Sequence, residues 1–305
     1  MSARSDVPSL IASPSSLPAQ SLRRPVRAAA TLHEQRDVTV HGLRLRYVDV
    51  PAQGPEEDSP ILLIHGHSSR LEEYEALIPH LSRTRRVLVP DLPGSGYSEK
   101  PKDVRYSLAL LEDSLLGFLD ALEIERAHLG GGSLGGNLVL RLGHREPGRF
   151  GKLAAWAPAG SWAEPMHGWA LFGKVMRNLR FMFWPSLWVQ SRFWYSKSWP
   201  GRDKALADVW TYFREVYDEG FHRMYWEVGI DQALTTLFDR AHRIEHPTYL
   251  AVGDRDNGLD MHQNVKRLAR LLPRARLRVF EGARHSLANE IPEALGTEID
   301  AFLHE

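Results

Sequence analysis

The chain contains no cysteine, and this absence excludes several kinds of chemistry at once. Its 305 residues can form no disulfide, no thiolate metal site and no cysteine nucleophile. No apolar run reaches the length of about 18 residues that a transmembrane helix needs. Lysine plus arginine and aspartate plus glutamate each number 38, so no net charge favours nucleic acid as a partner. Small or neutral substrates fit this charge balance better.

Residues 1–36 are rich in serine, proline, alanine and arginine. They lack the apolar block of a secretory signal, and they hold too few apolar side chains to build a core. We therefore expect a disordered N-terminal tail and a cytoplasmic protein. An arginine-containing tail with few acidic residues is also typical of organelle presequences, so organelle targeting stays open.

The stretch from Arg126 to Leu142 reads RAHLGGGSLGGNLVLRL and contains the pattern G-x-S-x-G. An apolar strand pattern meets a helical pattern there, with Ser133 at the bend between Gly131 and Gly135. Side chains at the two glycine positions would collide in so tight a turn, and such backbone strain is usually kept where a side chain must be presented for chemistry. Ser133 is therefore the candidate nucleophile, although a glycine-rich turn can also carry a serine by chance.

Short apolar segments alternate with helical patterns through most of the chain. After a hairpin at residues 37–50, we expect strands over 61–64, 86–89, 152–156, 247–252 and 276–280, and helices over 74–81, 108–122, 261–272 and after Pro292. This alternation predicts an α/β fold, a mostly parallel central sheet with helices on both faces, built from residues 37–158 and 241–305. Catalytic groups then belong at the carboxyl ends of the strands.

Residues 159–240 interrupt the alternation and hold eight of the nine tryptophans, on mainly helical patterns. We expect an inserted helical cap whose aromatic side chains form a core and partly line an apolar pocket. Four of them are candidate pocket residues: Trp162, Trp169, Phe181 and Trp184. Because Lys174, Arg177 and Arg180 alternate with aromatic residues, a cap that contacts a membrane interface is the second interpretation.

Ser133, Asp256 and His285 each follow a different predicted strand, in the order nucleophile, acid, histidine. Three further segments match a family pattern: H-G at 65–66, D-L-P-G-x-G-x-S at 91–98 and G-x-x-D at 253–256. Together these motifs resemble the α/β-hydrolase family. The layout is similar to the lidded epoxide hydrolases and haloalkane dehalogenases, but those have an aspartate where this chain has Ser133. The serine favours acyl chemistry over alkyl-enzyme chemistry.

The resemblance implies a catalytic triad in which His285 takes the proton of Ser133 and Asp256 orients the imidazole. Two backbone N–H groups are the candidates for an oxyanion hole, those of His67 and Leu134. Asp254 and Asp260 are rival acids, and the resemblance favours Asp256. The side chain of His67 is an alternative contact for the substrate.

We therefore expect a serine hydrolase without cofactor or metal that cleaves a carboxylic ester or related acyl bond of an apolar small molecule. A carbon–carbon bond hydrolase of the same fold is the alternative, because Ser133-Leu134-Gly135-Gly136 fits that group. No tryptophan follows His285, although relatives of that group often carry one. A ligand-binding receptor that keeps the triad but turns over slowly is the third hypothesis.

Overall fold

The computed structural model describes residues 31–55 and 59–305, so most of the predicted N-terminal tail lies outside the described residues. Its centre is a single sheet of eight strands in the order β1-β2-β4-β3-β5-β6-β7-β8. The strands are β1 (Gln35–Val40), β2 (Leu43–Val50), β3 (Ile61–Ile64), β4 (Val87–Pro90), β5 (Ala127–Gly132), β6 (Phe150–Trp156), β7 (Thr248–Gly253) and β8 (Ala275–Phe280). β2 pairs antiparallel with β1 and β4, and the remaining neighbours are parallel, which confirms the predicted α/β class.

The first two strands form the expected hairpin, with His41 and Gly42 in the turn. Both residues have a positive φ, as a two-residue turn between twisted antiparallel strands requires. β1 starts at Gln35, two residues earlier than the sequence pattern indicated.

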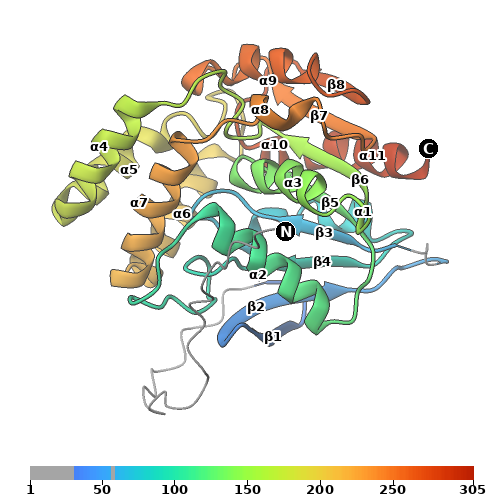
Figure 1. Ribbon diagram of the computed structural model, residues 1–305, viewed down its shortest axis with the longest axis horizontal. Helices are drawn as coiled ribbons and strands as arrows, with labels where there is room; N and C mark the ends of the chain where they lie inside the picture. The colour runs from blue at the N-terminus through green and yellow to red at the C-terminus, as the bar shows by residue number, and fades with distance from the viewer. Residues whose placement is uncertain (1–30, 56–58) are drawn as a thin grey trace, which may run out of the picture.

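Helices cover both faces of the sheet (Figure 1). The core helices are η1 (Leu71–Tyr74), α1 (Ile78–Leu81), α2 (Leu108–Ala121), α3 (Leu134–Arg145), η3 (Gly258–Asp260), α9 (Met261–Ala269), α10 (Leu287–Glu290) and α11 (Pro292–His304). On β3, Leu62 and Ile64 pack with α2 and α3, whereas Ile61 and Leu63 pack with α1 and α11. Two apolar layers therefore enclose the sheet, because strand side chains alternate between its faces.

Two helix starts agree with the sequence analysis and one helix differs from it. The Ser107 hydroxyl accepts the Leu110 N–H at the start of α2, and Pro292 occupies the first turn of α11. The helix expected over residues 74–81 is instead the 3₁₀ helix η1 followed by the single turn α1. Pro79 explains the break, because a proline inside a helix removes an N–H and clashes with the preceding turn.

The segment between β6 and β7 holds the helices α4 (His167–Asn178), η2 (Arg180–Met182), α5 (Phe183–Ser191), α6 (Arg202–Val216), α7 (Glu219–Ala233) and α8 (Phe238–Ala241). Figure 1 shows α4 to α7 gathered beyond one end of the sheet. Aromatic rings hold these helices together around Phe183, whose ring lies 4.4 Å from that of Tyr217 and 5.0 Å from that of Tyr225.

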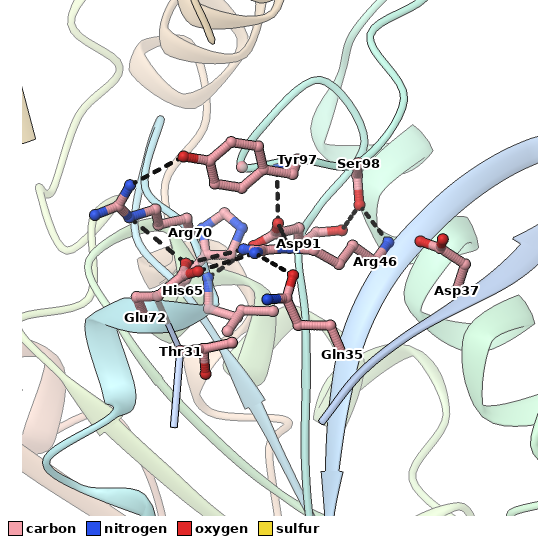
Figure 2. A network of polar contacts seen from close by, with 12 residues as sticks. Thr31, Gln35, Asp37, Arg46, His65, Arg70, Glu72, Asp91, Tyr97 and Ser98 are labelled. Carbon is pink, nitrogen blue, oxygen red and sulfur yellow. Dashed lines mark hydrogen bonds and ion pairs between the residues drawn. The ribbon is translucent and has the colours of Figure 1, made fainter. Parts of the chain in front are cut away.

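A buried ionic network connects β2 to η1 and to the loop after β4 (Figure 2). Arg46 on β2 donates to Asp91 at 2.7 Å and to both oxygens of Glu72 at 2.9 and 2.8 Å. Asp91 also accepts the backbone N–H groups of Leu71 and Tyr97, both at 2.7 Å. Burial alone would lower the pKa of Arg46, but Asp91 and Glu72 raise it above its ordinary value. The D-L-P-G-x-G-x-S segment therefore holds loops in place.

Replacing Arg46 by methionine should lower the free energy of unfolding by about 3–5 kcal/mol, because the buried Asp91 loses its ion-pair partner and Glu72 keeps only Arg70. Urea denaturation followed by circular dichroism measures this loss. Arg276→Met is the matched control, since Arg276 pairs with Glu305 on the surface and should contribute at most about 1 kcal/mol. Equal losses in the two variants would contradict a structural role for the network.

Candidate active site

Ser133 lies between the end of β5 and the start of α3, at the carboxyl edge of the parallel strands. Its φ of 54° is positive, which a residue with a side chain adopts only at an energetic cost. Its N–H donates to the Trp156 carbonyl at 3.0 Å, and its carbonyl accepts the N–H groups of Asn137 and Ala159 at 3.0 and 2.9 Å. Three backbone hydrogen bonds therefore hold the strained residue in place.

The glycines around Ser133 leave no room for side chains. A Cβ atom on Gly135 would lie 1.7 Å from the carbonyl oxygen of Ile64. A Cβ atom on Gly131 would lie 2.7 Å from the Gly135 carbonyl carbon. The turn therefore needs glycine at both positions because β3, β5 and α3 meet there with backbones in contact.

The buried side chain of Tyr74 joins the ends of β3 and β5 next to Ser133. Its hydroxyl donates to the Ile64 carbonyl at 2.7 Å and accepts the Gly132 N–H at 3.0 Å. Burial raises the pKa of Tyr74 well above its ordinary value, so the hydroxyl stays protonated and keeps its donor. Sequence reasoning missed this residue, because a tyrosine in a helical pattern looks like an ordinary core residue.

Asp256 and His285 form a hydrogen-bonded pair on the loops after β7 and β8. The Asp256 Oδ2 atom lies 2.7 Å from His285 Nδ1, and Asp256 is only 2% exposed. Burial alone would lower the pKa of His285, but the charge of Asp256 and its hydrogen bond raise it above 6.5. The carboxylate fixes the ring orientation and leaves Nε2 as the second nitrogen of the imidazole.

The rival acids have other positions. Asp254 accepts the Gly282 N–H at 2.7 Å, so its carboxylate ties together the two loops that carry Asp256 and His285. Asp260 is exposed at the end of η3, in a left-handed backbone conformation. Of the three carboxylates, the structure pairs that of Asp256 with the histidine.

Ser133, Asp256 and His285 line one cavity of about 1120 Å³. Among the described residues no hydrogen bond joins the Ser133 hydroxyl to the His285 ring. Contacts of this kind are often long before a substrate binds and shorten in the complex.

Leu134 and the loop after β3 flank Ser133, as the predicted oxyanion hole requires. Leu134 is the first residue of α3, where a backbone N–H has no partner inside the helix. The loop lies against Ser133, because a Cβ atom on Gly66 would be 3.6 Å from the Ser133 Cβ atom. Glu73 holds this loop by accepting the Gly66 N–H at 2.9 Å. His65 accepts the Leu92 N–H with its Nε2 atom, so it shapes the same loop.

The side chain of His67 also faces the cavity. Its ring stacks on that of Tyr225, with centroids 5.0 Å apart and planes at 27°. Burial lowers the pKa of His67 to about 4, so the ring is neutral at physiological pH. Its buried Nε2 atom has no hydrogen-bond partner among the described residues. A neutral, unpartnered nitrogen of this kind is suited to contact a polar group of a substrate.

The cavity wall differs in part from the predicted pocket. Trp162 and Trp169 line it, but Phe181 and Trp184 do not. Phe181 points away from the cap interior and is 71% exposed, and Trp184 stacks inside the cap on Trp210. Sequence reasoning missed several apolar wall residues because aromatic density does not reveal which helix face turns inward: Met166, Phe172, Val189, Phe193, Trp226 and Ile230.

Carboxylates outnumber cations in the cavity wall. Six acidic side chains line it, namely Glu72, Glu73, Glu75, Asp208, Glu215 and Asp256, against the two cations Arg70 and Lys204. Arg70 pairs with Glu72 at 3.5 Å, and Lys204 pairs with Asp208 at 3.0 Å. An anionic substrate would therefore meet repulsion and no uncommitted cation.

Two hydrogen bonds connect the cap to the histidine loop. Arg284 donates from Nη1 to the Arg192 carbonyl at 2.7 Å, and the Ser286 N–H donates to the Trp194 carbonyl at 3.0 Å. The loop that carries His285 is therefore bonded to the segment directly after α5.

Within residues 31–55 and 59–305, no group of three or more histidine, aspartate or glutamate side chains is arranged to hold a metal ion. Nor does any helix of this part of the chain have the length and apolarity to cross a membrane.

A protein-family model described as alpha/beta hydrolase fold matches residues 59–288. The 2-hydroxymuconate semialdehyde hydrolase of Pseudomonas putida is 28% identical over 281 residues, which cover 88% of this chain and 94% of that protein. The crystal structure of a meta-cleavage product hydrolase from Pseudomonas fluorescens IP01 has a TM-score of 0.67 and 25% identity, covering 88% of this chain and 97% of that one. A membrane phospholipase A, described as a bacterial virulence factor, has a TM-score of 0.71 and 26% identity, covering 89% and 86%.

Replacing Asp256 by asparagine should lower the pKa of His285, because the largest favourable charge beside the imidazolium is removed while its burial remains. Titration of the His285 ring by NMR measures the shift. Asp254→Asn is the control and should leave that pKa nearly unchanged, since Asp254 bonds to a backbone N–H instead. A pKa that responds to Asp254→Asn and ignores Asp256→Asn would reverse the assignment of the acid.

Proposed function

Since this chain belongs to the alpha/beta hydrolase family, we propose that it is a serine hydrolase that cleaves carboxylic esters of uncharged, apolar small molecules. The reaction passes through an acyl-Ser133 intermediate that water then hydrolyses. One observation carries the proposal. The strained Ser133 and the hydrogen-bonded pair of Asp256 and His285 line the same cavity.

In this mechanism His285 removes the proton of the Ser133 hydroxyl as the oxygen attacks the ester carbonyl. The same proton then passes to the leaving alcohol, and a water molecule repeats the sequence on the acyl-enzyme. General base catalysis of this kind contributes roughly 100- to 10,000-fold to the rate. Asp256 stabilises the imidazolium that forms in each half of the reaction.

The developing negative charge on the carbonyl oxygen is stabilised by the backbone N–H groups of His67 and Leu134. Removal of one such donor typically costs about 3 kcal/mol of transition-state stabilisation. Glu73 supports this arrangement indirectly, because its hydrogen bond to Gly66 fixes the loop in which His67 lies.

The charge of the cavity wall favours an ester over an anionic carbon–carbon substrate. Both cations of the wall already pair with carboxylates, and four further carboxylates surround the space. The substrate in the name of the Pseudomonas putida relative is itself a carboxylate. A neutral ester avoids the repulsion that such an anion would meet. The resemblance to a phospholipase A is in line with ester chemistry.

A carbon–carbon bond hydrolase is the second candidate. The muconate semialdehyde hydrolase aligns over nearly the whole of this chain, and the meta-cleavage product hydrolase has the same fold at 25% identity. In this alternative the same three side chains act on a vinylogous diketone, and the His67 Nε2 atom, which has no hydrogen-bond partner among the described residues, is available to a substrate oxygen.

In both alternatives residues 159–240 act as the cap that selects the substrate. Apolar side chains from α4, α5 and α7 line the cavity opposite Ser133. The acyl or alcohol group of the substrate would pack against them.

The Ser133→Ala variant should lose ester turnover by about 10⁴-fold or more and should no longer be labelled by a fluorophosphonate probe, because the nucleophile is absent. Circular dichroism should show an unchanged fold. Ser186→Ala is the control, because the Ser186 hydroxyl donates to the Phe183 carbonyl inside α5. This variant should keep both labelling and turnover. Full activity in the Ser133→Ala variant would refute the acyl-enzyme.

Chromogenic esters graded by acyl length should be turned over many times per enzyme molecule, whereas a vinylogous diketone acid should react slowly, because its carboxylate meets an acidic wall. Product formation per enzyme, measured by absorbance, separates the three hypotheses. Faster turnover of the diketone acid would favour the carbon–carbon alternative. One product per enzyme followed by arrest would favour a ligand receptor.

A further inference from the structure

The stretch from Pro165 to Arg202 is positively charged although the whole chain is neutral. It contains no aspartate or glutamate, and its six cations are Lys174, Arg177, Arg180, Arg192, Lys197 and Arg202. α4, η2 and α5 lie within it. This stretch is therefore positively charged, whereas the wall of the cavity is mainly acidic.

The helix α4 turns its large apolar side chains outward. Its buried positions are the small residues Ala170 and Gly173, and a Cβ atom on Gly173 would lie 2.8 Å from Ile230 on α7. Leu171 is 64% exposed, and Trp169, Phe172 and Val175 are about half exposed. A helix that packs on its own protein normally shows the reverse pattern. Trp169 and Phe172 also reach the cavity wall, but the exposed Leu171 and Val175 lie outside it.

The next helices, η2 and α5, also expose large apolar side chains. Phe181 on η2 is 71% exposed, and Trp188 and Val189 on α5 and Phe193 after it are about half exposed. Eight of the eleven large apolar side chains exposed among the described residues belong to this stretch. We call them the outer cap surface: Trp169, Leu171, Phe172, Val175, Phe181, Trp188, Val189 and Phe193. Clustering of this kind marks an interaction site.

The outer cap surface shares residues with the wall of the cavity. Four of its members are exposed and also line the cavity: Trp169, Phe172, Val189 and Phe193. Whatever covers this surface therefore also borders the cavity that Ser133 lines.

We propose that the outer cap surface docks onto an anionic lipid bilayer, from which an apolar substrate enters the cavity. Aromatic and aliphatic side chains of such a surface immerse at the boundary between headgroups and acyl chains, and flanking cations bind lipid phosphates. Arg192 shows the required arrangement, because its guanidinium stacks 3.6 Å from the Trp188 ring centroid on the exposed face. Tryptophan and arginine are both typical of membrane interfaces.

Charge favours a bilayer over a second copy of this chain as the occupant. A symmetric dimer would place the same surface against itself. Arg177 and Arg202 already pair with Glu227 and Asp203. The other four cations of Pro165–Arg202 form no ion pair among the described residues, and in such a dimer they would meet their own copies. Anionic headgroups supply the missing negative charge. The inference does not depend on which bond the enzyme cleaves.

Flotation with liposomes of the full-length protein tests the docking. The protein should float with phosphatidylcholine vesicles that contain phosphatidylglycerol, and should float less with phosphatidylcholine alone or in high salt. The Leu171→Gln/Phe181→Gln double variant should bind at least about tenfold more weakly, because two large apolar side chains no longer enter the bilayer. Leu271→Gln is the control, since Leu271 is exposed on the core domain far along the chain. It should bind like the original protein.

A second pair of variants tests the role of charge in the same flotation experiment. The Lys174→Glu/Arg180→Glu variant should lose the preference for anionic vesicles. The control Arg126→Glu should keep it. Leu171 and Phe181 are not in the cavity wall, so turnover of a water-soluble ester should be unchanged in the double variant. This readout separates failed docking from failed catalysis. Absence of flotation with anionic vesicles, or equal flotation of the double variant and the control, would overturn the proposal. A dimer in vesicle-free solution that Leu171→Gln/Phe181→Gln dissociates would assign the surface to a second copy instead.

Discussion

The close approach of Gly135 to the end of β3 is the constraint on which the rest of the site depends. No side chain fits between the Gly135 Cα atom and the Ile64 carbonyl, so α3 starts directly beside the neighbouring strand. This contact bends the chain at Ser133 into a positive φ, and the hydrogen bonds of Tyr74 to Ile64 and Gly132 secure it. The strained conformation persists because backbone hydrogen bonds of Ser133 and the two hydrogen bonds of Tyr74 hold the surrounding chain in place.

Much of this arrangement could be predicted because it is encoded in short-range rules. G-x-S-x-G needs its glycines wherever it folds, and the segments after β7 and β8 converge because adjacent parallel strands end at the same edge. The hydrogen bond between Asp256 and His285 follows from that convergence. The choice between Asp254 and Asp256 did not follow from spacing alone, since it depends on which carboxylate meets the Gly282 N–H.

The cap was predictable only as a helical, aromatic segment. The sequence pattern indicated helices without their bounds, and the pocket depends on how each helix is rotated against its neighbours. Phe181 and Trp184 were expected in the pocket and lie outside it, because one faces solvent and the other packs on Trp210. The ion pairs of Arg46 with Glu72 and Asp91 also join residues far apart in the chain, and the spacing of these residues does not reveal the pairs.

The two hydrogen bonds from the histidine loop to the Arg192 and Trp194 carbonyls have a mechanical consequence. Any displacement of the end of α5 from this loop breaks them, and the loop is then held by its bonds to Asp254 and Asp256. The position of the loop that carries His285 is therefore coupled to the position of the segment after α5. A change that displaces the backbone at Arg192 or Trp194 is thereby transmitted to the proposed general base, without altering any of the three proposed catalytic side chains.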